Sequence, residues 1–90
     1  MNKAELVERI SKATNQTKLS VEETVNAALD IIKKAVRKGE DVTLVGFGTF
    51  TQSNRKARAG RNPQTGKLIE IPAMTVPRFK PGKDFKDLLQ

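Results

Sequence analysis

The stretch of sequence that decides the fold is Gln52–Ile71, QSNRKARAGRNPQTGKLIEI. Its outgoing half is polar and has almost no large apolar side chains. Its centre begins with Asn62 and Pro63 at the first two positions of a typical type I turn, and Gly66 is available where a positive φ is needed. The segment is therefore predicted to be a two-stranded β-ribbon. A ribbon this polar cannot lie under a core, and an isolated hairpin is marginally stable in water, so we expect a mobile arm that a ligand orders.

Two helices are predicted before the ribbon. Asn2 followed by Glu5 forms a capping-box arrangement at the start of the first helix, whose apolar positions recur on one face up to Ala13. The second helix begins at Thr17 or at Ser20, and the pattern leaves both starts open. Its apolar stripe continues to Val36, and Lys38 and Gly39 supply a basic last turn and a stop.

A short sheet is predicted around the ribbon. Val42–Val45 is rich in β-branched residues, and Gly46–Gly48 supplies a tight turn before the next strand, Thr49–Thr51. After the ribbon, Ala73–Phe79 brings apolar residues back to the body. Pro72 and Pro77 cannot donate to a ladder and so predict edge positions or bulges. A short C-terminal helix carries Phe85, Leu88 and Leu89 on one face.

These elements predict an α+β fold in a single domain, because ninety residues support only one small core. We expect a helical hairpin over residues 1–39, a sheet body over 40–54 and 72–82, a β-arm over 55–71, and a C-terminal helix over 83–90.

The charge of the chain favours an anionic partner. Seventeen Lys and Arg residues against ten Asp and Glu residues give a net charge of +7. The excess lies in the second half, where residues 51–90 hold nine bases and three acids. Between Thr51 and Ile69 there is no acid and there are five bases: Arg55, Lys56, Arg58, Arg61 and Lys67. A solvated surface is the alternative explanation of such a run, but an acid-free ribbon suits a negatively charged groove.

The composition argues against an enzyme. Without Cys or His there is no disulfide framework, no thiolate or imidazole metal site and no nucleophile or base of those types, so no metal or cofactor is expected. The best carboxylate pairs, Glu22-Glu23 and Glu40-Asp41, are explained by helix capping and solvation. No apolar run is long enough for a signal peptide or a membrane span, so we expect a cytosolic-type protein without a membrane partner.

Arginine and proline in the arm indicate how DNA would be bound. A planar guanidinium enters a narrow minor groove at a lower desolvation cost than an ammonium, which makes Arg55, Arg58 and Arg61 the primary candidates. Their spacing places them on one face only if the ribbon is twisted or bulged. Pro63 is rigid and apolar and could wedge between base pairs, or it could simply set the turn.

A two-fold assembly is predicted from the apolar residues. The second helix, Phe47, Phe50 and Phe79 offer more apolar surface than one small helical hairpin and a short sheet can cover. The alternative is that Phe47, which lies between two glycines, packs within its own hairpin.

The segments Gly46–Phe50, Gly60–Lys67 and Pro77–Lys83 together resemble the bacterial HU family of histone-like DNA-binding proteins, and the resemblance covers essentially the whole chain. It implies an intertwined dimer in which a helical base supports a three-stranded antiparallel sheet saddle and two arms. It assigns the dimer core to Phe47, Phe50 and Phe79, and DNA binding to nine residues: Arg55, Arg58, Arg61, Asn62, Pro63, Lys3, Lys80, Lys83 and Lys86. Leu68 departs from the polar residue expected on the return strand.

The resemblance further implies a protein of the bacterial nucleoid that bends and compacts double-stranded DNA. Little sequence preference and a preference for distorted or nicked DNA are expected from recognition through backbone and deformability. The alternatives are a site-specific relative of the integration host factor type and an RNA-binding protein, with RNA as a secondary ligand. The sequence also leaves open whether the chain forms a homodimer or a heterodimer with a paralogue.

Overall fold

Helix α1, Lys3–Thr14, begins where the sequence predicts, because the side-chain oxygen of Asn2 accepts a hydrogen bond from the Glu5 amide at 2.9 Å. The computed structural model describes residues 1–90. These residues form two compact units, Met1–Lys34 and Ala35–Gln90. Helix α1 ends at Asn15, which adopts a left-handed φ of 57°.

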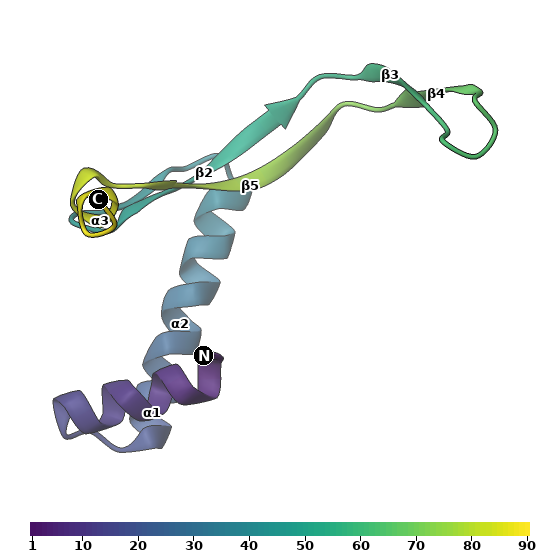
Figure 1. Cartoon of the computed structure of the whole chain (residues 1–90). Helices are drawn as coiled ribbons and strands as arrows, with labels where there is room; N and C mark the ends of the chain where they lie inside the picture. Colours follow the sequence, from purple (N-terminus) through teal and green to yellow (C-terminus); the bar gives the residue numbers. More distant parts are fainter. The chain divides into compact units, whose positions relative to one another are not determined.

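Helix α2, Lys18–Arg37, starts at the first of the two predicted positions. Thr17 accepts a hydrogen bond from the Ser20 amide through its hydroxyl at 3.2 Å and so acts as the N-cap, while Ser20 lies inside the helix. Lys3 donates to the Asn26 side chain at 2.9 Å, which holds the start of α1 against the middle of α2. The two helices therefore pack around the buried Val7 and Val21, with α1 lying across α2 (Figure 1).

Helix α2 ends in a Schellman motif. Gly39 has a φ of 86° and donates to the Val36 carbonyl, and the Glu40 amide donates to the Ala35 carbonyl at 2.9 Å. The predicted glycine stop is confirmed.

The sheet of the second unit has three antiparallel strands in the order β1-β2-β5: β1, Val42–Leu44; β2, Gly48–Arg55; and β5, Met74–Pro81. The predicted α+β class and three-stranded sheet are confirmed, and β5 is an edge strand, as its Pro77 requires. The turn between β1 and β2 begins one residue earlier than the sequence predicts. The Phe47 amide bonds to the Leu44 carbonyl and Gly46 has a φ of 83°, so Val45 lies in the turn, 97% exposed, and Gly48 belongs to β2.

The arm continues the β2–β5 ladder after a short interruption, as two paired strands, β3, Arg58–Arg61, and β4, Leu68–Ile71 (Figure 1). Arg55 pairs with Met74 and Arg58 with Ile71, so each strand has two residues in the interruption. Equal numbers on both strands mean that the register is unbroken and the arm contains no bulge. Pro72 lies in the interruption and has no amide to donate.

The tip of the arm is a loop of four residues, 63–66, closed by backbone hydrogen bonds from both sides. The Gly66 amide donates to the Asn62 carbonyl at 2.7 Å, and the Asn62 amide donates to the Lys67 carbonyl at 2.9 Å. Gly66 has a φ of 71°, which confirms the predicted need for glycine. The Asn62 side chain supports this loop by accepting a hydrogen bond from the Gln64 amide at 2.9 Å.

Helix α3, Lys83–Asp87, is shorter than the predicted C-terminal helix. Phe85 is half-buried, whereas Leu88 and Leu89 follow the helix with 83% and 78% of their surface exposed. Only three apolar side chains in the whole chain are buried, Val7, Val21 and Val36. No helix has the length and apolar character that crossing a lipid bilayer requires.

Candidate nucleic-acid interface

The three arginines of the arm are exposed and have no acidic partner. Arg55 is the last residue of β2, and Arg58 and Arg61 begin and end β3. The chain contains only two ion pairs, Lys12–Glu8 and Lys33–Asp30, and both lie on the helices. None of the nine bases of residues 51–90 forms an ion pair, and the five in the arm are all exposed.

The register decides on which face each arginine lies. Paired residues of an antiparallel ribbon share a face, so Arg58 shares one with Ile71 and Arg61 shares the other with Leu68. Because the arm contains no bulge, Arg58 and Arg61 lie on opposite faces of β3. The one-face arrangement that a bulge would have allowed does not occur.

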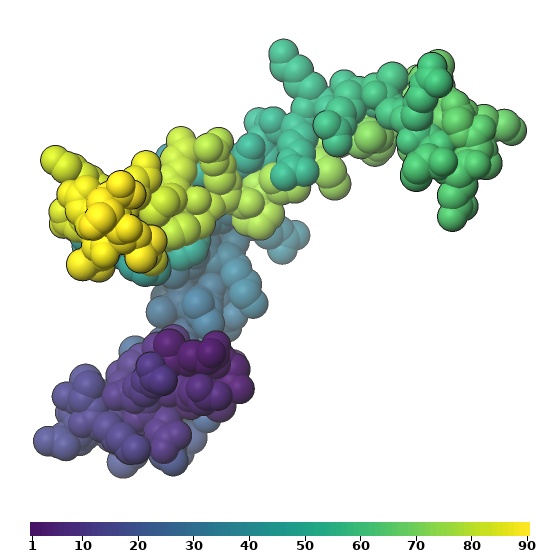
Figure 2. Space-filling view, in the orientation of Figure 1, coloured from purple at the N-terminus to yellow at the C-terminus, as the bar shows by residue number.

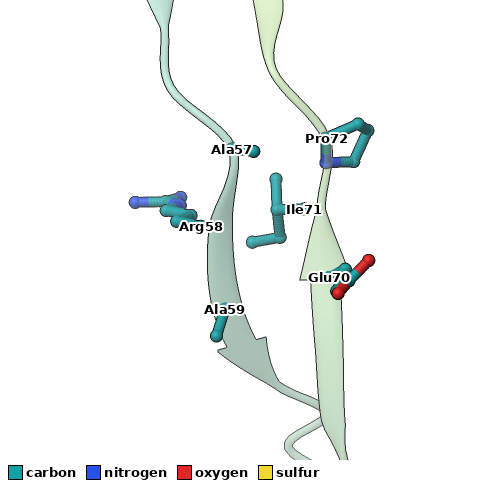
Figure 3. A pocket seen from close by; sticks show the side chains of 6 residues that line it. All are labelled: Ala57, Arg58, Ala59, Glu70, Ile71 and Pro72. Atoms are coloured by element: carbon teal, nitrogen blue, oxygen red, sulfur yellow. The ribbon is translucent and has the colours of Figure 1, made fainter.

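Two isoleucines of the return strand pack over a glycine of β3. A Cβ built on Gly60 would lie 3.0 Å from Cδ1 of Ile71 and 3.8 Å from Cγ1 of Ile69. In Figure 3, Ile71 lies between the two strands, while Arg58 projects outward beyond β3 and Glu70 beyond β4. The missing side chain at Gly60 therefore leaves room for the two isoleucines, and the side chain of Arg58 points away from them.

The residues at the tip of the arm differ in exposure and in their hydrogen bonds. Asn62 is half-buried, and its side-chain oxygen is occupied by the Gln64 amide, so this predicted DNA contact also shapes the loop. Pro63 is exposed and makes the first corner of the loop. Leu68, the first residue of the return strand β4, is 72% exposed. In the space-filling view, the green atoms of this far end stand clear of the yellow atoms of α3 (Figure 2).

The sheet has an open face that carries two more cations. Lys80 pairs with Thr49 and Arg78 with Thr51, which places both on the face opposite Phe50 and Phe79. Arg78 was not among the predicted contacts. Strand alternation places Arg78, like Lys80, on the face opposite the apolar Phe79, and this pattern could have identified it from the sequence.

The remaining predicted lysines are also exposed. Lys83 and Lys86 lie on α3, shortly after Lys80 at the end of β5. Lys3 lies in the other unit, where its ammonium donates to the neutral side chain of Asn26 and not to a carboxylate. None of the four lysines is paired with a carboxylate.

All four phenylalanines form one cluster in the second unit. The ring centroids of Phe50 and Phe79 lie 4.9 Å apart, and Phe47 lies 5.2 Å from Phe79 and 5.3 Å from Phe85. Phe47 does pack with its own hairpin, but 44% of it remains exposed, as does 37% of Phe79. The cluster is thus an incompletely covered apolar surface.

No group of three or more acidic side chains comes together in a way that could hold a metal ion. The geometry is that of a binding surface: an exposed cationic ribbon with a proline at its tip, and further cations on an open sheet face.

Comparison with known proteins gives consistent matches along the chain. The model of the family described as bacterial DNA-binding protein matches residues 1–90. The chain is 48% identical over 90 residues to DNA-binding protein HU of Geobacillus stearothermophilus, with full coverage of both chains. It is 51% identical over 87 residues to DNA-binding protein HU of Clostridium pasteurianum, covering 97% of this chain and 96% of the relative.

Solved structures agree. An HU–DNA cocrystal structure from Anabaena matches with a TM-score of 0.93 at 47% identity, over 99% of this chain and 97% of that one. HU from Thermotoga maritima matches with a TM-score of 0.71 at 31% identity, over the whole of both chains.

Proposed function

This chain belongs to the bacterial DNA-binding protein family that includes HU, and on that premise we propose that it bends and compacts double-stranded DNA with arms placed in the minor groove. The observation that carries the proposal is the arm itself. Arg55, Arg58 and Arg61 stand exposed on a two-stranded ribbon that contains no ion pair. A ribbon that nothing in its own chain neutralises is suited to a polyanion.

The alternation of the arginines supports groove binding. A ribbon that lies in a groove has a sugar-phosphate wall on each side, and Arg58 and Arg61 project from opposite faces. Each can therefore reach a different wall. Arginine fits this place because a narrow minor groove concentrates negative potential and a guanidinium is weakly hydrated.

Pro63 is proposed to supply the bend. It is exposed and sits at the far end of the arm, and its ring is apolar and rigid. Such a side chain can enter between base pairs and unstack them, which costs a few kcal/mol per step and is offset by contacts along the bent flanks. Lys3, Lys80, Lys83 and Lys86, together with Arg78, are proposed to make those flanking phosphate contacts.

Two chains are proposed to form the working unit, with Phe47, Phe50 and Phe79 in the shared core. Large apolar side chains outside the arm are exposed, among them Leu29, Ile31 and Phe47. A two-fold interface would remove this apolar surface from water.

The dimer is tested by sedimentation of the chain expressed alone. A species of twice the chain mass supports a homodimer. A monomer that becomes dimeric only when a paralogous chain is added supports the heterodimer instead, and a monomer under both conditions contradicts the proposal.

Recognition is proposed to depend on DNA shape, with action at the nucleoid in the bacterial cytoplasm and without enzymatic activity. A gel-shift series with intact, nicked and four-way-junction DNA of matched length is the direct test. We expect tighter binding to nicked and junction DNA, because these need less energy to bend, and equal binding to scrambled duplexes.

Two results would contradict this account. Strong preference for one duplex sequence at matched salt would indicate a site-specific protein. Stronger competition by single-stranded RNA than by nicked DNA would make RNA the primary ligand, whereas weak competition agrees with RNA as a secondary one.

A further inference from the structure

Gln52 is a polar residue on the apolar face of the sheet. In the β2–β5 ladder, Phe50 pairs with Phe79 and Gln52 pairs with Pro77. Alternation places all four side chains on the same face. An amide among two phenylalanines and a proline must find hydrogen-bond partners, because an unsatisfied polar group there costs more than an apolar side chain would.

The partners of Gln52 are the last carbonyls of α2. Its side-chain nitrogen donates to the Val36 carbonyl at 2.6 Å and to the Arg37 carbonyl at 3.2 Å. The last carbonyls of a helix lack donors from within the helix. The Val36 carbonyl also accepts from the Gly39 amide, so Gln52 adds a second donor there and supplies the donor to the Arg37 carbonyl. The side chain of Gln52 therefore acts as a cap supplied from the sheet.

The neighbouring residue is tied to the same junction from the other face. The Thr51 hydroxyl donates to a carboxylate oxygen of Asp41 at 2.5 Å, in the short connection between α2 and β1. Among the residues of β2 that follow Gln52, the only side-chain hydrogen bond joins Asn54 to Thr75 on the ladder partner β5. Thr51 and Gln52 are therefore the last residues of β2 that are hydrogen-bonded to any element other than β5.

We infer that Gln52 is a positioning residue that anchors the root of the arm on the end of α2 and so fixes the direction in which the arm leaves the sheet. The anchor is a property of the free protein. Only its consequence for DNA bending rests on the proposed function.

Two variants separate anchoring from packing. Gln52→Leu removes both donors but fits the apolar face, so a residue that merely fills space would be replaced without loss. Gln52→Lys keeps a donor, and a cation is favourable at the C-terminus of a helix. Gln16→Leu, the same change in the exposed turn before α2, is the matched control.

The first measurement is amide hydrogen exchange of residues 53–55 in the free protein. We expect exchange in Gln52→Leu to be faster by roughly tenfold, while the thermal midpoint changes little, and near-parental exchange in Gln52→Lys and Gln16→Leu. Parental exchange in Gln52→Leu, or faster exchange in both Gln52 variants, would overturn the inference.

The second measurement is the distance between spin labels at Val45→Cys and Gln64→Cys, which label cleanly because the chain has no cysteine. Labelled chain is diluted into excess unlabelled chain, so that only distances within one chain contribute. The distribution should broaden with Gln52→Leu and be restored with Gln52→Lys; an unchanged distribution would overturn the inference. If it broadens and the DNA bend is unaffected, the anchor stands and the arm's proposed role in bending fails.

Discussion

At the scale of single residues, Arg58 and Arg61 are the cations whose contribution can be measured most directly. Both are exposed and unpaired, so replacing either with alanine removes one proposed phosphate or groove contact and leaves no carboxylate without its partner. We expect each substitution to weaken DNA binding by roughly tenfold and to reduce the slope of log K against log salt by about one. Titration of one duplex at several salt concentrations measures both.

The control for the arginines is Lys12→Ala, which removes an exposed cation that is already paired with Glu8 on α1. It should leave affinity and slope nearly unchanged. If it has the same effect as Arg61→Ala, binding reflects net charge alone and the arm has no special role.

Replacing Pro63 is expected to change DNA bending more than DNA affinity. Pro63→Ala keeps the loop bonds of Asn62 and Gly66 but removes the ring, so the bend angle should fall more than the affinity does. Fluorescence transfer between the ends of a short duplex reports the bend. Gln64→Ala, in the same loop, should leave it unchanged. Parental bending with Pro63→Ala would reduce the proline to a turn former.

At the scale of elements, Gly48 shows how tightly the sheet is built. A Cβ at this position would lie 2.5 Å from Cε1 of Phe79 and 2.6 Å from the Lys80 carbonyl oxygen, and a backbone atom cannot move aside as a side-chain end can. We expect Gly48→Ala to lower the free energy of unfolding by about 2–3 kcal/mol.

Denaturant unfolding at a fixed protein concentration measures this loss. Gly82→Ala serves as the control, because a Cβ there lies no closer than 3.4 Å to any atom, and its loss should be smaller. Equal losses in the two variants would mean that the contact with Phe79 is not what requires glycine.

The elements also show which features the sequence could predict. Local signals were sufficient for the start of α1 and for the glycine stop at Gly39, because each depends on hydrogen bonds within a few residues. For α2 they offered both Thr17 and Ser20, and only the structure selects Thr17. Val45 was misplaced because its β-branched side chain favours a strand, whereas the positive φ of Gly46 had already begun the turn.

The candidate site depended more on tertiary pairing. The cationic arm and its turn residues were visible in the sequence. The opposite faces of Arg58 and Arg61 required the register, and a single inserted residue would have reversed one of them. Gln52 gave no signal, because its partners are carbonyls of a helix sixteen and fifteen residues away.

At the scale of the whole molecule, the proposal separates a body that assembles from an arm that bends DNA. The unbroken register allows this division to be tested without disturbing the sheet. Deleting residues 56–73 and joining Arg55 to Met74 through Asn-Gly would close β2 and β5 with a two-residue hairpin between residues that already pair.

The shortened chain should fold and should still form the proposed dimer, because the arm shares no buried core with the body and the deletion leaves the phenylalanine cluster unchanged. Its body cations should still bind DNA weakly. Bending measured by fluorescence transfer should be lost, together with the preference for nicked over intact duplex, since no wedge reaches the base steps. Sedimentation and circular dichroism first establish that the variant is folded and paired. If such a variant still bends DNA as strongly as the parent, the deformation must come from the body, and the arm cannot be the source of the activity.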